Sequence, residues 1–379
     1  MAPKARPAEE AEPKERSILG VFSSHLKVAL VGLPCAGKST LFKILSEEIQ
    51  IPDEYIPTKG VEVDNVKVPD RHIALISQLY EKNVQVAPFF EIRDTPGIGL
   101  GSHIGEISGN EFLDEIRTVD GIFYVLRALK EDNMPHIYGT VNPTRDLKFL
   151  QLELQIKDAH ILENRIKELE HKMGLKSDKK LILEYELCIR LQAHVQSGKD
   201  VRFGKWNPAE ISIFNQYNLL TAKPVVYLVN ISAEDMRRRK NKFVTEIWNL
   251  VEVQDKVRIV PFSCAFERQL LSLTGDEATQ YCRDEKLESK IPKLIEKVFE
   301  ANGVIFFYTF NSDEVKWWQI RCKTKTLDAA YAVDKCKRAF VRIKVIKYED
   351  LLASGAKLAF KDVGNLYEIK DGDIVDFGA

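Results

Sequence analysis

The sequence predicts an α/β fold in which a parallel-rich sheet is interrupted by a helical hairpin and followed by a small α+β domain. Strand-like and helix-like runs alternate from Leu26 to about Leu129, as in a sheet with helices on both faces. From Asp146 the apolar residues instead recur at the spacing of one helix face, and strand character returns at 224. The predicted strands of the first sheet are 27–31, 89–93, 121–126, 224–230 and 258–262.

A glycine-rich loop follows the first strand. Segment 32–40 reads Gly-Leu-Pro-Cys-Ala-Gly-Lys-Ser-Thr, which fits G-x-x-x-x-G-K-[ST], and a helix is predicted to follow over 41–45. In such a P-loop, backbone N–H groups turn around the phosphates of a nucleoside triphosphate, and the lysine adds a positive charge. A chance match would not explain strand, loop and helix in this order. The predicted nucleotide contacts are Gly32, Pro34, Cys35, Ala36, Gly37, Lys38, Ser39 and Thr40, with Lys38 also catalytic.

Two further segments are candidates for the metal-binding side of this site. Asp94-Thr95-Pro96-Gly97 follows strand 89–93, where a carboxylate can hold Mg²⁺ through water and the Gly97 N–H can meet the γ-phosphate. Thr58 is a candidate for a hydroxyl that closes on the metal. An ordinary turn and an ordinary loop threonine are the alternatives. The predicted metal ligands are therefore Ser39, Thr58 and Asp94, and Thr58 and Gly97 join Lys38 as predicted catalytic groups.

Base recognition is expected where the last two strands of this sheet end. Asn230 ends one strand and Ile231 follows it, and Ser263-Cys264-Ala265, after the other strand, would bring backbone N–H groups near the base. Proteins that recognise guanine have an acidic residue three positions after the asparagine, and this chain has Ala233 there. Glu234 lies one position further, on a different face. ATP is therefore expected to be favoured over GTP.

The chain is expected to divide into four parts. Residues 1–24, rich in Ala, Pro, Glu and Lys, are predicted to form a disordered tail. The nucleotide domain is assigned to 25–145 and 220–302, the helical hairpin to 146–219, and the small α+β domain to 303–379. The hairpin consists of one long helix ending near Gly174 and a second helix over 183–195. Mutual packing of these helices is favoured over a cofactor site between them.

Composition narrows the expected environment and partners. The 379 residues are 45% hydrophobic and 29% charged, as in soluble globular proteins, and a net charge of −1 gives no overall attraction to nucleic acid. Six cysteines show no metal-ligand spacing and are expected to be reduced thiols of a cytoplasmic protein. No apolar run approaches the roughly 20 residues needed to span a bilayer. Neither a membrane nor DNA is expected as a partner.

The order of these pieces resembles the Obg-like ATPases, the YchF subfamily of P-loop GTPase-like proteins, over nearly the whole chain after about Leu26. The matching stretches are 32–40, 68–70, 109–113, 120–123, 141–146, 223–230, 261–263 and 371–374. The family architecture is a nucleotide domain split by a coiled-coil hairpin and followed by a TGS domain. The resemblance implies ATP use, often with some GTP binding, slow hydrolysis, and association with ribosomes and with translation or stress control.

Four departures from the family pattern fall on the chemistry. Cys35 replaces the phosphate-loop Asn that is a candidate potassium ligand, and a thiol is a poor ligand for that cation. Asp94-Thr95-Pro96-Gly97-Ile98 replaces the family's D-I-A-G-L, although Ile98 is still an apolar residue in place of a water-orienting Gln. Tyr124 replaces the proposed catalytic His of D-G-I-F-H, and Tyr is a poorer acid or base at neutral pH. Ala233 removes the acidic residue of the family's N-x-x-E.

Three functions remain open at this point. The leading hypothesis is a slow Mg²⁺-dependent nucleoside triphosphatase that acts as a switch, with a ribosome or ribosomal subunit as partner and a monomeric state. The second is a nucleotide-binding scaffold on ribosomal particles with negligible hydrolysis, which Cys35, Ile98 and Tyr124 favour. The third is a GTPase in which Glu234 or a backbone group replaces the missing acid.

Two smaller features also have two interpretations each. His103 could assist catalysis or be an exposed loop histidine. Basic residues surround Trp317 and Trp318, as in a surface for ribosomal RNA or as solvated lysines around core tryptophans. These basic residues are Lys316, Arg321, Lys323, Lys325, Lys335, Lys337 and Arg338.

Overall fold

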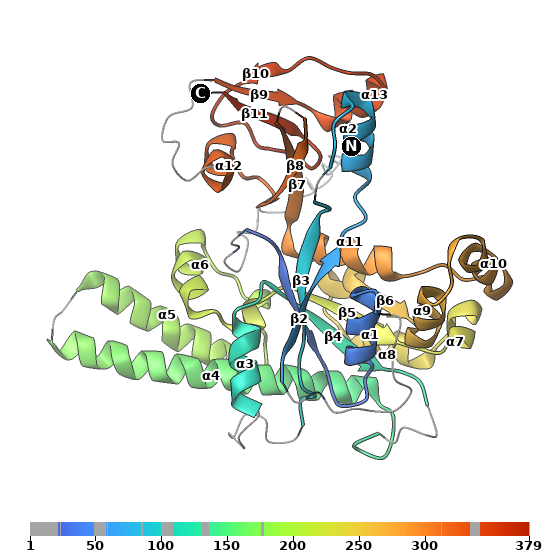
Figure 1. Ribbon diagram of the computed structural model, residues 1–379. Coiled ribbons are helices and arrows are strands. Elements are labelled where there is room, and N and C mark those ends of the chain that lie inside the picture. Colours follow the sequence, from blue (N-terminus) through green and yellow to red (C-terminus); the bar gives the residue numbers. More distant parts are fainter. Residues whose placement is uncertain are drawn as a thin grey trace, which may run out of the picture.

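Two β-sheets organise the molecule, with the smaller sheet above the larger one in Figure 1. Strand order is β2-β3-β1-β4-β5-β6 in the larger sheet and β10-β9-β11-β7-β8 in the smaller one. The helical hairpin projects from the side of the larger sheet. The computed structural model describes residues 22, 24–48, 58, 60–84, 86–99, 109–130, 136–175, 178–311, 313–333 and 342–378. The predicted tail therefore lies almost wholly outside the described residues.

The larger sheet is parallel except at one edge, where β2 runs antiparallel to β3. Its strands are β1 (Lys27–Val31), β2 (Glu62–Lys67), β3 (Phe89–Asp94), β4 (Gly121–Arg127), β5 (Val225–Asn230) and β6 (Ile259–Phe262). The predicted parallel-rich sheet is confirmed. The sequence analysis missed β2, because in this edge strand only Val66 is buried and the strand lacks an apolar run.

Helices cover both faces of the larger sheet, because neighbouring strand residues point to opposite sides. Leu30 and Phe123 join the core cluster under α1 and α11, whereas Val31 and Tyr124 join the cluster under α3, α4 and α8. The covering helices are α1 (Lys38–Leu45), α3 (Gly109–Arg117), α4 (Pro143–Leu175), α7 (Ala233–Arg238), α8 (Lys242–Leu250), α9 (Cys264–Leu271), α10 (Gly275–Glu285) and α11 (Ile291–Asn302). A short 3₁₀ segment, η4 (Val253–Arg258), leads into β6.

The inserted hairpin consists of α4 and α5 (Lys179–Gln196), which pack along one another. The 33 residues of α4 span about 50 Å, so one end packs on the sheet and the other extends away from it (Figure 1). The hairpin has its own core, to which Leu162, Leu169 and Leu191 belong. The chain returns through η1 (Val201–Phe203), α6 (Pro208–Phe214), η2 (Asn215–Tyr217) and η3 (Leu220–Ala222).

Asp158 anchors the hairpin to the returning chain. Its side chain is fully buried in α4, and Oδ1 accepts a hydrogen bond from the Leu220 N–H at 2.8 Å. Oδ2 accepts from the Thr221 N–H at 2.8 Å and from the Thr221 hydroxyl at 2.7 Å. These bonds satisfy donors of η3 that are removed from water.

The smaller sheet forms the C-terminal domain. Its strands are β7 (Val304–Phe310), β8 (Val315–Arg321), β9 (Arg342–Ile346), β10 (Lys361–Val363) and β11 (Ile374–Gly378), and its helices are α12 (Thr326–Val333) and α13 (Tyr348–Ser354). One face buries Phe307 and Val375 beneath Ala329 of α12. The other face contributes Phe306 and Tyr308 to the same apolar cluster that lies under α1 and α11 of the larger sheet. A single core therefore runs between the two domains.

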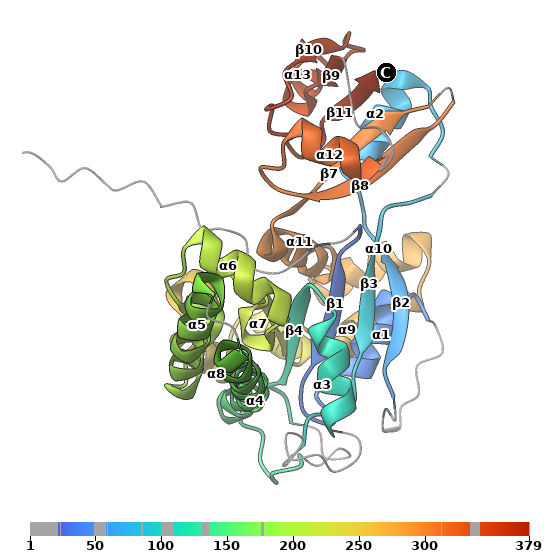
Figure 2. The same cartoon turned by 90° about the vertical axis from the view of Figure 1, so that its left-hand side faces the viewer.

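Helix α2 (Arg71–Tyr80) packs on the C-terminal domain although it precedes β3 in the chain (Figure 2). Asp70 caps the helix through Oδ1 and accepts a hydrogen bond from the Tyr308 hydroxyl through Oδ2. The Tyr80 hydroxyl donates to the Leu358 carbonyl at 3.1 Å. The Asn83 N–H donates to the Asp313 carbonyl at 3.1 Å. The segment between β2 and β3 thus leaves the larger sheet to complete the smaller domain.

The two tryptophans of β8 are packing residues. Trp317 contacts the rings of Phe89 and Phe306, and its indole N–H donates to the Val86 carbonyl at 2.9 Å. Trp318 stacks on Phe307. This packing favours the interpretation of core tryptophans over that of an aromatic surface. His103, Lys335, Lys337 and Arg338 lie outside the described residues.

Among the described residues, no helix is both long enough and apolar enough to cross a membrane.

Candidate functional site

The phosphate loop turns sharply between β1 and α1. Gly37 adopts a left-handed backbone with φ 98°, and a Cβ there would come within 2.8 Å of the Asn230 amide nitrogen. Cys35 is also left-handed, with φ 60°. Asparagine tolerates this conformation better than most side chains, so cysteine adopts it here at a greater backbone cost.

Lys38 is held in the loop by the loop's own carbonyl groups. Its side chain is 5% exposed, and Nζ donates to the Leu33 carbonyl at 3.0 Å and to the Gly32 carbonyl at 3.2 Å. Burial lowers the pKa of Lys38 from 10.5 to about 8, against the opposing effects of Asp94 and Cys35. A buried cation with so little compensation is a place where an anion binds favourably.

The three predicted metal ligands lie together. The Ser39 and Thr58 hydroxyl oxygens are 2.9 Å apart, and the Thr58 hydroxyl donates to Oδ2 of Asp94 at 3.3 Å. Oδ1 of Asp94 is buried and has no hydrogen-bond partner among the described residues. Burial raises the pKa of Asp94, while hydrogen bonds from Ser39 and Thr58 oppose the rise. Two hydroxyls and a carboxylate with an unpartnered oxygen suit a hard divalent cation such as Mg²⁺.

The segment after β3 lies against the phosphate loop. The Ile98 N–H donates to the Gly32 carbonyl at 3.1 Å, and a Cβ on Gly97 would come within 2.7 Å of Pro34. Gly97 is therefore required by the close approach of the two loops. The Ile98 side chain is completely buried in the core.

Asn230 connects the phosphate loop to the loop after β6. Its side-chain amide donates to the Ala36 carbonyl at 3.3 Å and accepts from the Cys264 N–H at 3.2 Å. Ser263 uses its hydroxyl to cap α9, Ala265 is exposed in the first turn of that helix, and Ile231 is buried in the core. The structure thus gives Asn230 a positioning role that the sequence analysis did not predict.

The side chains after Asn230 present no carboxylate at the guanine-reading position. Ala233 is the first residue of α7, and Ser232 caps that helix by accepting from the Asp235 N–H at 3.1 Å. Glu234 is exposed and pairs with Arg238 one turn further along. Its carboxylate is therefore engaged on the outer face of the helix.

Tyr124 lies in the core beneath α4 and is 1% exposed. Its ring contacts that of Tyr227, with the centroids 5.9 Å apart. Burial raises the pKa of Tyr124 well above 10. A side chain so placed neither reaches the phosphate loop nor exchanges protons at neutral pH.

These features define a class of protein, the P-loop nucleoside triphosphatases with a GTPase-type fold. A family model described as "50S ribosome-binding GTPase" matches residues 27–165. The YchF-GTPase_C model, described as "Protein of unknown function", matches residues 304–379.

The chain belongs to the Obg-like ATPase (YchF) family. Over its whole length it is 45% identical to "Obg-like ATPase 1" of Oryza sativa subsp. japonica, and it covers 98% of that protein. It is 35% identical to "Obg-like ATPase 1" of Homo sapiens, over 96% of this chain and 95% of that one. The solved structure of the Schizosaccharomyces pombe YchF GTPase matches with a TM-score of 0.81 at 30% identity, over 96% of this chain and 100% of that one. The predicted family resemblance is confirmed.

The pKa of Lys38 leads to a first prediction. Below about pH 8 the free protein carries a charged Lys38, and above it the lysine is neutral. A bound triphosphate favours the charged form, so binding takes up a proton above pH 8 and affinity falls as pH rises, by up to about tenfold per unit. ATP titrations at neutral and alkaline pH, repeated in buffers of different ionisation enthalpy, measure this uptake. Constant affinity across that range would contradict the role of Lys38.

Proposed function

We propose that the protein binds Mg²⁺ and a nucleoside triphosphate, with ATP favoured over GTP, and hydrolyses it slowly as a nucleotide-controlled switch. The observation that carries the proposal is the unpartnered, buried Oδ1 of Asp94 beside the hydroxyls of Ser39 and Thr58. Mg²⁺ held there would neutralise phosphate charge. Lys38 would bind the phosphates, and the Gly97 N–H would meet the terminal one.

Slow hydrolysis is supported by what the site lacks among the described residues. Ile98 cannot orient water by hydrogen bonding, and Tyr124 is buried out of reach. The same two residues support the alternative of a scaffold that holds nucleotide with negligible turnover. The relatives' name, Obg-like ATPase 1, supports ATP use.

Titration of the purified protein with ATP and GTP, with and without Mg²⁺, tests the proposal when followed by single-turnover hydrolysis. Tight, Mg²⁺-dependent ATP binding with measurable turnover would support the switch. Binding without turnover, even with ribosomes added, would support the scaffold. Absence of nucleotide binding would refute the assigned site.

The base preference gives a second prediction. Replacing Ala233 by Asp places a carboxylate three residues after Asn230, where it can accept from two guanine N–H groups. Hydrogen bonds to a charged group contribute about 1.5–3 kcal/mol, so GTP affinity should rise about 10-fold to 100-fold. Competition titrations of ATP against GTP measure the change. Ala233→Asn is the control and should give no such gain, and equal gains in both variants would contradict this account of base recognition.

A ribosome or ribosomal subunit is the proposed partner, supported by the description "50S ribosome-binding GTPase" of the matching model. A conformational change on nucleotide binding would start at Thr58, which precedes β2 in the chain. It would continue through α2 to the C-terminal domain. Closing Thr58 on the metal would pull on β2, and Asp70 transmits this to Tyr308 of β7. Single-turnover rates with and without ribosomes test the partnership, and identical rates combined with no co-sedimentation would refute it.

A further inference from the structure

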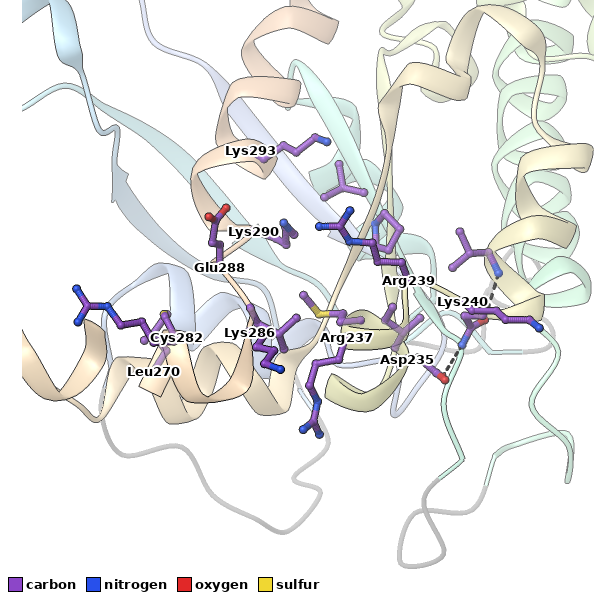
Figure 3. Close-up of a pocket in the computed structure, with 18 of the residues that line it drawn as sticks. Asp235, Arg237, Arg239, Lys240, Leu270, Cys282, Lys286, Glu288, Lys290 and Lys293 are labelled. Atoms are coloured by element: carbon purple, nitrogen blue, oxygen red, sulfur yellow. Dashed lines mark hydrogen bonds between the residues drawn. The ribbon is translucent and has the colours of Figure 1, made fainter. Parts of the chain in front are cut away.

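A cavity opens between α7, α8, α10 and α11, at the outer edge of β6 (Figure 3). Its volume is about 1110 Å³, against about 300–1,000 Å³ for typical small-molecule pockets. Ile231 contributes to its wall, but no residue of 32–40 does, nor do Thr58, Asp94 or Asn230. The cavity is therefore separate from the phosphate-binding loop.

The cavity is strongly basic in a chain whose net charge is −1. Seven cationic and two acidic residues line it, and one of the acids, Asp235, already accepts a hydrogen bond from the Asn241 amide at 2.8 Å. The cations come from three separate segments: the end of α7, the end of α10 and the start of α11. In Figure 3 the charged ends of Arg239, Lys290 and Lys293 converge at one end of the cavity. Convergence of this kind creates a positive potential that favours an anion.

Most of this charge is not neutralised locally. Arg237 pairs with Glu285 at 3.5 Å. By contrast, Arg239, Lys240 and Lys293 form no ion pair within the part of the chain that the structure describes. Cations at helix ends also complement the helix dipole, which accounts for residues near the ends of α7 and α10. It does not account for Lys293, which lies in the first turn of α11, where a positive charge is unfavourable.

Two of the cations occupy backbone positions that suit glycine. Arg239 ends α7 with φ 49°, and Lys286 ends α10 with φ 54°. At such left-handed helix ends glycine is the usual residue, since other side chains are strained there. Glycine can therefore replace Arg239 or Lys286 without backbone strain.

The floor of the cavity is apolar. It is formed by Ile231, Met236, Val244, Val260, Leu270 and Leu287. Among the described residues that line the cavity, none is aromatic, so it lacks the stacking platforms of proteins that bind single-stranded RNA. Apolar floor and basic rim together match a small ligand that carries both a non-polar body and several phosphates.

We propose that this cavity is a second ligand site, which binds an organic polyphosphate through the cations that line it, Arg239, Lys286, Lys290 and Lys293, and through its apolar floor. The phosphate chain could belong to a free small molecule or to a nucleic-acid backbone. The absence of aromatic residues from the lining favours the small molecule.

Equilibrium dialysis of the full chain with ATP and with inorganic tripolyphosphate tests this proposal. Lys38→Ala weakens binding at the phosphate loop about 10-fold to 100-fold. At ligand concentrations too low to fill that weakened site, the remaining binding should reach one ligand per chain, with ATP tighter than tripolyphosphate because of the floor. Adding Arg239→Gly and Lys286→Gly should weaken that binding at least about tenfold. Both glycines relieve left-handed strain, so thermal stability should be unchanged or higher, which excludes loss of folding as the cause.

Lys323→Gly is the matched control, because Lys323 is a left-handed cation in the C-terminal domain with φ 65°. This control in the Lys38→Ala background should leave ATP binding unchanged. Binding that is absent in Lys38→Ala, or that survives the two glycine substitutions, would overturn the proposal. Binding of a short oligouridylate alone, sensitive to the same substitutions, would replace the small molecule by an RNA backbone. If the phosphate-loop site itself failed, wild type and Lys38→Ala would bind equally, and the two glycine substitutions would still separate the sites.

Discussion

Replacing Lys38 by alanine is expected to lower ATP hydrolysis at least about 100-fold, as loss of a charge that stabilises the transition state generally does. The reason is local: Lys38 is buried in the phosphate loop, and its ammonium is the cation that the loop carbonyls of Gly32 and Leu33 hold in place. ATP binding should weaken about 10-fold to 100-fold, the range for one lost charge-assisted hydrogen bond of about 1.5–3 kcal/mol. Single-turnover hydrolysis and equilibrium titration measure the two effects separately.

Lys43→Ala is the matched control for this experiment. Lys43 lies in the same helix, α1, but its ammonium pairs at 3.5 Å with Glu48 at the surface. Its removal should change neither binding nor turnover. If Lys38→Ala retained wild-type turnover, the phosphate-loop lysine would have no catalytic role and the switch hypothesis would lose its main residue.

Replacing Asp158 by alanine is expected to destabilise the protein by about 3 kcal/mol or more. The substitution removes the acceptor of three hydrogen bonds and leaves the N–H groups of Leu220 and Thr221 buried without partners. Each unsatisfied buried donor costs about 1–3 kcal/mol. Urea denaturation followed by far-UV circular dichroism gives the free energy of unfolding.

Glu163→Ala on the same helix provides the comparison for Asp158→Ala. Glu163 is at the surface and pairs with Lys167 at 2.6 Å, so its loss should leave the denaturation midpoint unchanged within error. Equal effects of the two substitutions would show that Asp158 does not anchor the hairpin.

Most of the larger sheet could be predicted from the sequence because its central strands are buried on both faces. Such strands read as continuous apolar runs, as in β4 and β5, where every residue is buried. The strands at the sheet edges and in the smaller sheet were harder to predict from the sequence. β8 was missed because Val315–Arg321 reads Val-Lys-Trp-Trp-Gln-Ile-Arg, in which charged and polar residues beside two tryptophans also suit a solvent-facing surface.

The phosphate side of the site was predictable for a different reason. Its residues follow one another in a short motif, so the spacing alone places Lys38 and Ser39 at the start of a helix. Asp94 follows a predicted strand of the parallel sheet, whose loops lie together at one end, whereas Thr58 was chosen as a hydroxyl that could close on the metal. The structure places both near Ser39. Whether these residues perform the assigned chemistry is still a prediction.

Long-range features could not be predicted from local patterns. The bond from Asn230 to Ala36 joins residues 194 positions apart, and the docking of α2 depends on strands near the end of the chain. The basic cavity likewise collects cations from three segments that individually read as ordinary charged helix ends. Such features emerge only when tertiary contacts are formed.

The position of α2 also sets an order of events during synthesis. Tyr308, which receives the helix through Asp70, follows it by 238 residues. At about 5–20 residues per second a ribosome needs roughly 10–50 s to make that stretch. Throughout this interval Ile73 and Ile76 of the nascent helix lack the partners that bury them in the finished protein. The emerging amino-terminal half is therefore a natural client for a chaperone until the last strands have left the exit tunnel.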